Sequence, residues 1–306
     1  MLDLLPAMKL VHIYNREIWT CLIVSLLIAA ILLSNNLLAQ EKKRVYINTF
    51  SFSPTYQIEV FNWSIAGDLN GRDPNVLSEL IWNNRYLGYK AETIFSYGNI
   101  ETSISFDKVK AIEGKVKDND YAGNNREFTT SSESFNSRGG SKRSVYILVG
   151  NKRLRNLQIG YHQENGDYRL NHDLKGIFSS YNVKIKGVSI GYLYGNFFQN
   201  RKLSLTTRSI FSTNNYKGQG SWILRNDLKK DVSFFQKASG VEFFSNVNLS
   251  YNIYIFSLGL GTSFKLSHYF KGIDKLYYVN GNSALTRLNN VDYRFSEIII
   301  YFGIRI

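Results

Sequence analysis

One hydrophobic block constrains this chain more than any other feature. Residues 19–38 form an almost unbroken apolar run, and the rest of the 306-residue chain holds no second run of this kind. Lys9 and Arg16 precede the block, and it ends in a stretch that closes with Ala39. A basic start, an apolar centre and a small residue before a cleavage point are the parts of an export signal. The sequence therefore predicts a signal peptide over residues 1–39.

The alternative to a cleaved signal is an uncleaved anchor helix. Leu37 stands two residues before Ala39, where a small residue is usual, and its size leaves that alternative open. Cys21 is the single cysteine of the chain, and it lies at the front of the apolar run, so it leaves with the signal. An exported protein without disulfides must be held together by burial or by a closed network of backbone hydrogen bonds.

Hydrophobic residues recur with period two along the rest of the chain. Ile100, Thr102, Ile104 and Phe106 alternate with Glu101, Ser103, Ser105 and Asp107, and the same pattern returns near residues 241–249. A soluble sandwich seldom points two carboxylates into its core, whereas a membrane barrel places apolar side chains toward lipid and polar ones toward its lumen. The mean hydropathy of −0.22 agrees with such averaging. Ten strands are expected, at about 55–66, 77–96, 100–112, 142–150, 157–168, 180–194, 202–213, 239–250, 252–266 and 291–305.

The lengths of the gaps between these stretches support the barrel independently. Short gaps, such as 97–99 and 151–156, alternate with long ones, such as 113–141 and 267–290. Short turns on one rim and long loops on the other are typical of bacterial outer-membrane barrels. We therefore expect an all-β, closed, antiparallel up-and-down barrel over 55–306, preceded by a polar leading segment over 40–54. The ending IIIYFGIRI would close the barrel against the first strand and serve as a signal for the barrel-assembly machinery.

Three short motifs in the first half of this region resemble a known family. Ser78-x-Leu80-x-Trp82, then Asp118, Asp120 and Tyr121, then Gly160-Tyr161 with Glu164 follow the order and spacing found in the omptins. The resemblance is best over about residues 78–168. It implies a ten-stranded outer-membrane endopeptidase in which an aspartate pair faces an Asp-x-His dyad, with a water between them that attacks the peptide. Asp118 and Asp120 match the aspartate pair and are the candidate catalytic residues.

The other half of the omptin site is not found in the sequence. The dyad should follow the seventh expected strand, but residues 212–220 contain neither Asp nor His, and Asp227 and Asp231 come later without an imidazole beside them. A carboxylate pair without a histidine to take the water's proton is incomplete. We therefore expect a non-catalytic surface, structural or adhesion barrel. The alternatives are an active omptin-type endopeptidase, with His162, His172 or His268 as the base, and a small-solute channel.

Charged residues suggest two further roles. Arg138, Lys142 and Arg143 are expected at the outer rim, where cations suit the phosphates of membrane lipid and of lipopolysaccharide. Across the lumen, side chains from the inward faces could pair, namely Lys90, Glu92, Glu101, Asp107 and Glu242. We expect a monomer in the cell outer membrane with no metal and no cofactor. Nucleic acid is not an expected partner of an exported chain, despite the net charge of +13.

Overall fold

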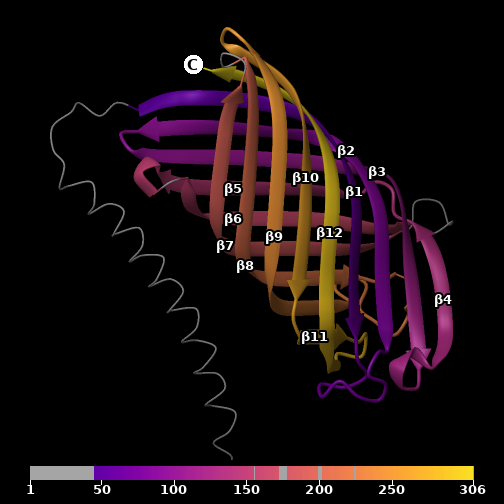
Figure 1. Ribbon diagram of the computed structural model, residues 1–306. Coiled ribbons are helices and arrows are strands. Elements are labelled where there is room, and N and C mark those ends of the chain that lie inside the picture. The colour runs from indigo at the N-terminus through magenta and orange to yellow at the C-terminus, as the bar shows by residue number, and fades with distance from the viewer. Residues whose placement is uncertain (1–44, 155, 172–177, 199–201, 224, 306) are drawn as a thin grey trace, which may run out of the picture. The chain divides into compact units, whose positions relative to one another are not determined.

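The chain forms a closed antiparallel barrel. A computed structural model describes residues 45–154, 156–171, 178–198, 202–223 and 225–305. The export signal predicted over 1–39 therefore lies outside the described residues. Ten strands follow one another around the ring, and β1 pairs with β12 to close it (Figure 1). They are β1 (Val45–Ile65), β2 (Ser78–Tyr97), β3 (Ile100–Ala122), β5 (Ser141–Asn151), β6 (Leu157–Asn171), β7 (Phe178–Phe198), β8 (Leu203–Ser221), β9 (Phe234–Ile253), β10 (Phe256–Tyr269) and β12 (Ser283–Arg305).

The prediction of a ten-stranded up-and-down barrel is confirmed. Thr49 of β1 lies opposite Arg305 of β12, and the pairing continues to Ile65 opposite Leu288, so the last strand closes the ring as expected. Among the described residues, no helix has the length and apolar character needed to cross a bilayer. Two short 3₁₀ turns, η1 (Asn124–Arg126) and η2 (Lys152–Leu154), are the helical elements there.

Two further strands lie beyond the ring, at the rim that carries the long connections, here called the long-loop rim. β4 (Phe128–Asn136) pairs with the end of β3 above the point where β5 begins, and Figure 1 shows it curving away from the neighbouring strands. β11 (Gly272–Tyr277) pairs with β12 and β9 above the end of β10. The expectation that 113–141 and 267–290 are loops is thus wrong, because the sheet continues through much of both.

The first strand also begins earlier than expected. β1 starts at Val45, so residues 45–54 of the predicted leading segment are strand. This strand contains Pro54, and proline lacks the N–H that a sheet requires. In the structure Pro54 lies opposite Tyr89 of β2, whereas the register with β12 passes from Phe52 to Thr55. A proline is tolerated in this strand because that stretch of ladder is interrupted on one side.

The outer face of the barrel is apolar in a band near the opposite rim, here called the short-turn rim. On β9, Phe243, Val247 and Leu249 are exposed while Glu242, Phe244 and Asn246 on the alternate face are buried. The alternation predicted for β3 also holds, with Ile104 outward and Ser103 and Ser105 inward. A continuous apolar outer band of this kind is what a lipid-facing barrel surface requires.

The interior has two different layers. Near the long-loop rim, inward side chains form an apolar core that includes stacked rings: Phe61 lies 4.6 Å from Tyr168, and Trp82 lies 5.6 Å from Tyr181, between ring centroids. Trp82 and Tyr181 have no exposed surface. The expectation of a wet lumen is therefore wrong for this layer. The polar layer lies below it, toward the short-turn rim, where the inward residues of β1 change from Phe61 and Trp63 to Gln57 and Glu59.

Candidate functional site

The aspartate pair predicted from the sequence lies on a strand rather than in a loop. Asp118 is opposite Leu80 of β2, and Asp120 is opposite Ser78, in the part of β3 that extends toward the long-loop rim. Residues directly opposite in an antiparallel pair share a face of the sheet. Because Leu80 is buried in the apolar core, Asp118 points to the same inward side. The two carboxylates therefore do belong to one face, as the resemblance requires.

A third carboxylate joins this pair. Glu133 of β4 lies directly opposite Asp118, and Ser131 donates a hydrogen bond from Oγ to Asp120 Oδ2 at 3.1 Å. Burial raises the pKa of Asp118 to about 7, and the negative charges of Asp120 and Glu133 act in the same direction. Near neutral pH the Asp118 carboxyl is thus divided between its protonated and ionised forms. Because these carboxylates lie together on the inward face and the pKa of Asp118 is raised, they form the strongest candidate site at the long-loop rim.

The charged group that opposes these carboxylates is a guanidinium. Arg225 comes from the connection between β8 and β9, and its positive charge lowers the pKa of Asp118 against the stronger effects named above. Arg225 is itself held by Asp227, with Nε to Oδ1 at 2.8 Å and Nη2 to Oδ2 at 2.7 Å. A guanidinium stays protonated and cannot take a proton from water. The connection in which the resemblance placed the Asp-x-His dyad instead carries an Arg-x-Asp ion pair.

The two described histidines lie elsewhere. His162 has no exposed surface, stacks on Tyr146 at 4.9 Å, and has its Nε2 3.6 Å from Oε1 of Glu242 in the lumen. His268 is on the outer face of β10, where its Nδ1 lies 2.6 Å from Oδ1 of Asp292. His172 lies outside the described residues. Within the described part of the chain, no histidine is among the groups that act on Asp118. Asp118 and Asp120 are therefore brought together on one face, and neither of the described histidines serves them as a base.

The predicted lipid-phosphate cluster is split by the barrel wall. Lys142 points into the lumen, where its ammonium is bound to Glu59 and donates a hydrogen bond to the Tyr293 hydroxyl at 2.5 Å. It is 6 % exposed, so its assignment to a lipid-facing cluster is wrong. Arg138 and Arg143 are exposed. Because side chains alternate along a strand, neighbours such as Lys142 and Arg143 must lie on opposite faces of the barrel wall, one toward the lumen and one toward the outside.

A more extensive cationic surface escaped the sequence reasoning. Lys184, Lys217 and Lys237 lie directly opposite one another on β7, β8 and β9, and all three are exposed on the outer face. Arg143 lies opposite Lys108 in the same way on β5 and β3. We call these five residues the cationic row. The lysines are far apart in sequence, so only the strand register reveals that they are neighbours.

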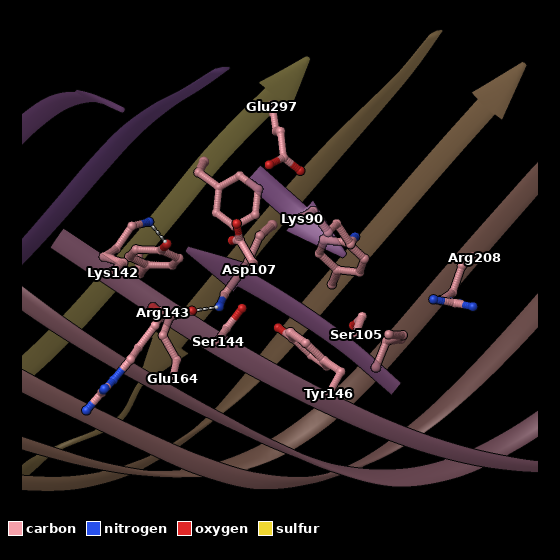
Figure 2. A pocket seen from close by; sticks show the side chains of 15 residues that line it. Lys90, Ser105, Asp107, Lys142, Arg143, Ser144, Tyr146, Glu164, Arg208 and Glu297 are labelled. Carbon is pink, nitrogen blue, oxygen red and sulfur yellow. Dashed lines mark hydrogen bonds and ion pairs between the residues drawn. The ribbon is translucent and has the colours of Figure 1, made fainter. Parts of the chain in front are cut away.

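The lumen holds a cavity of about 30 Å³, enough for roughly two waters. Figure 2 shows Lys90, Asp107, Lys142, Arg208 and Glu297 around it. Ion pairs cross this layer: Arg208 binds Glu92, and Lys265 Nζ lies 2.7 Å from Glu164 and 3.0 Å from Glu242. Gln57 bridges two carboxylates, with Nε2 3.2 Å from Asp107 and 2.8 Å from Glu297. The pairing across the lumen that was predicted for Glu92 and Glu242 is found, although with partners that were not named.

Ring closure, the apolar outer band and the inward carboxylates together define a ten-stranded transmembrane β-barrel. Its fold is similar to that of the outer membrane protease OmpT from Escherichia coli, with a TM-score of 0.65 over 87% of this chain and 99% of that one, at 11% sequence identity. The omptin resemblance seen in the sequence is thus confirmed for the fold. A Pseudomonas aeruginosa FadL homologue aligns at a TM-score of 0.28 and 8% identity over 85% of this chain and 90% of that one. No protein-family model and no curated protein matches the chain.

Proposed function

We propose that this chain is a non-catalytic outer-membrane barrel that serves a surface role, structural or adhesive, through its long-loop rim. The observation that carries the proposal is the Arg225–Asp227 ion pair, which occupies the connection where an endopeptidase of this fold needs an imidazole. Among the residues that the structure describes, no histidine then acts on Asp118 as a general base that could activate water. The extended β3–β4 hairpin, with its exposed serines and threonines, provides the surface that such a role uses.

A cleavage assay tests this proposal directly. The protein is refolded in lipopolysaccharide and given a fluorogenic peptide library, beside Asp118→Ala and Asp120→Ala variants. We expect no turnover above that of the refolding buffer in any of the three samples. Cleavage by the unaltered chain that both substitutions abolish would overturn the proposal and would support the endopeptidase alternative. Cleavage that survives both substitutions would come from a contaminant or from another site, and it is resolved by repeating the assay on material purified twice.

We also propose that the cationic row contacts lipid phosphates in the outer leaflet. Like charges that lie directly opposite on neighbouring strands repel each other, so the Lys184, Lys217 and Lys237 neighbours are unfavourable unless an anion shares them. Lysine ammoniums and the Arg143 guanidinium suit phosphate oxygens through charge-assisted hydrogen bonds. All are on the face that continues into the apolar band. A polyphosphorylated lipid such as lipopolysaccharide would offer both the anion and the acyl chains.

A further inference from the structure

The hairpin that joins β9 to β10 ends in a tip without an exposed polar side chain other than a tyrosine hydroxyl. Ile253, Tyr254, Ile255 and Phe256 are consecutive, and their exposed fractions are 51%, 95%, 53% and 56%. A turn at the short-turn rim is expected in water, where four such residues would be unfavourable. We propose that this tip lies within the lipid of the adjacent leaflet and anchors the barrel there. The inference rests on the proposed location in a membrane.

The tip continues the apolar outer face without a break. On β9 the outward side chains above it include Tyr251, Leu249 and Val247, and on β10 they include Leu258 and Leu260. Protein-binding patches usually have a polar rim around an apolar centre, and this tip has apolar neighbours on both of its strands. Lipid is therefore a better occupant than a soluble partner.

The length of this face indicates how deep the tip lies. On β9 the outward side chains from Val241 to Ile253 are apolar apart from the half-buried Ser245, and the exposed Ser239 and Lys237 fix the upper limit of this face. Twelve steps at about 3.3 Å, on a strand tilted by about 40°, span roughly 30 Å along the barrel axis. The apolar band of such barrels is about 25 Å tall. The tip thus extends about 5 Å further than a band of ordinary height, to the depth of the lipid headgroup boundary.

The backbone of the turn gives a second, independent indication. Phe256 pairs with Ile253, so Tyr254 and Ile255 form a two-residue turn, and Tyr254 has a φ of 51°. The first position of such a turn favours glycine when its φ is positive, because a side chain there is strained. A tyrosine at this position costs backbone strain, and favourable contacts of its ring with the surroundings would offset that cost. Tyrosine is the residue type that is enriched where membrane meets water.

The turn between β2 and β3 provides a matched comparison. Tyr97 pairs with Ile100, so Gly98 and Asn99 form a two-residue turn at the same rim, and Gly98 has a φ of 58°. This turn has the same backbone problem and solves it with glycine, followed by a polar residue. It is what a water-exposed tip is expected to look like. The two turns therefore differ in chemistry and not in length.

Site-directed fluorescence in vesicles tests the inference. Cys21→Ser leaves the chain without a thiol, and single cysteines are then introduced as Tyr254→Cys, Asn99→Cys and Leu260→Cys, each labelled with a small environment-sensitive dye after refolding into phospholipid vesicles. Leu260 is 65% exposed in the middle of the apolar band and reports membrane insertion itself. Quenching is measured with iodide in the water and with nitroxide-bearing lipids. We expect iodide to quench the dye at position 99 at least threefold more strongly than at 254, and the lipid nitroxide to show the reverse.

The outcomes separate the inference from the proposed function. If the dye at 260 is quenched by lipid while the dye at 254 is quenched by iodide as strongly as that at 99, the anchor is overturned and the membrane location stands. If iodide quenches the dye at 260 as well, both are overturned. An unlabelled Tyr254→Gly variant controls for the dye: it should unfold in detergent no more easily than the unaltered chain, yet be extracted from vesicles at a lower detergent concentration. Equal extraction would count against the anchor.

Discussion

Arg225 and Asp227 form a bidentate ion pair, with Nε to Oδ1 at 2.8 Å and Nη2 to Oδ2 at 2.7 Å. Two parallel hydrogen bonds fix the guanidinium plane, so Arg225 remains on the side from which its charge acts on Asp118. In a protease of the omptin type this connection would supply a proton acceptor. Here it supplies a permanent cation, whose charge favours the ionised form of Asp118.

The state of Asp118 should make the stability of the barrel depend on pH. Its folded pKa of about 7 lies above the unfolded value of 3.8, so the folded state binds more protons between those two values. The stabilisation is fully present below pH 4 and is lost as the pH rises through about 7. Asp118→Asn should flatten this dependence and stabilise the protein by about 1–2 kcal/mol at pH 8, with little effect at pH 4. Denaturant unfolding in detergent at both pH values measures the effect, with the exposed Asp231→Asn as control; equal shifts at the two pH values would contradict it.

The Lys142–Glu59 pair should behave as a buried ion pair. Lys142→Met leaves the Glu59 carboxylate uncompensated inside the barrel and should cost about 3–5 kcal/mol of unfolding free energy. The double variant Glu59→Gln/Lys142→Met removes both charges and should recover most of that loss. The unfolding midpoint in detergent distinguishes these cases. A double variant as unstable as the single one would mean that Lys142 acts through its contacts with the Tyr86 and Tyr293 rings and not through its charge.

The aromatic layer should be a principal source of stability. Trp82 is fully buried between the rings of Phe61, Tyr168 and Tyr181. Trp82→Ala leaves a cavity in this layer and should cost about 3–5 kcal/mol, whereas the exposed Leu87→Ala should cost less than about 1 kcal/mol in detergent. Heat-dependent gel mobility and denaturant titration report both values. Similar losses for the two variants would show that the layer is loosely packed.

The barrel should not conduct ions. The aromatic layer fills the lumen near one rim, and ion pairs such as Arg208–Glu92 cross it further down. Planar bilayer recordings should show no unitary steps under conditions in which a porin, inserted in parallel, gives them. Regular steps from the purified protein would revive the channel alternative.

The cationic row makes a prediction about lipid. Lipopolysaccharide should raise the melting temperature of the refolded barrel relative to uncharged detergent, and added salt should reduce the effect. The triple variant Lys184→Gln/Lys217→Gln/Lys237→Gln should lose at least half of this increase. The control Lys115→Gln/Lys117→Gln/Lys271→Gln removes the same charge from other exposed positions and should keep it. Equal losses in the two variants would mean that only net charge matters.

The ten strands of the ring could be predicted because each has one face toward lipid and the other toward the barrel interior. Where one face meets lipid and the other a polar interior, as around Ile104 and Ser105, period-two alternation marks the strand. In β4 most side chains on both faces are polar, and β11 is only six residues long, with Asp274 buried on its inward face. The alternation then disappears although the backbone ladder continues, which is why β4 and β11 were expected to be loops.

Period two also leaves open what an inward side chain meets. It places Phe61 and Trp82 inside, but only the folded ring shows that they contact one another rather than water. The aspartate pair was identified from the spacing of residues that are close in sequence, which can be seen without knowledge of the tertiary structure. Arg225, by contrast, is more than a hundred residues away from Asp118, and the cationic row is spread over five strands whose register brings its members together. Neither relationship can be predicted from residues that are close together in the sequence.

The seam between β1 and β12 joins the first and last described segments, with Thr49 opposite Arg305. The strand that leaves the ribosome first must therefore wait for the one that leaves last, and a chain truncated before residue 291 would expose one edge of β1 to hydrocarbon with its peptide groups unsatisfied. The ring can consequently close only in a chain that retains its last strand. The same proximity means that the first and last strands of the barrel, β1 and β12, could be joined by a linker and the polypeptide opened at another short turn, such as Gly98–Asn99, to give a circular permutant with the same strand order.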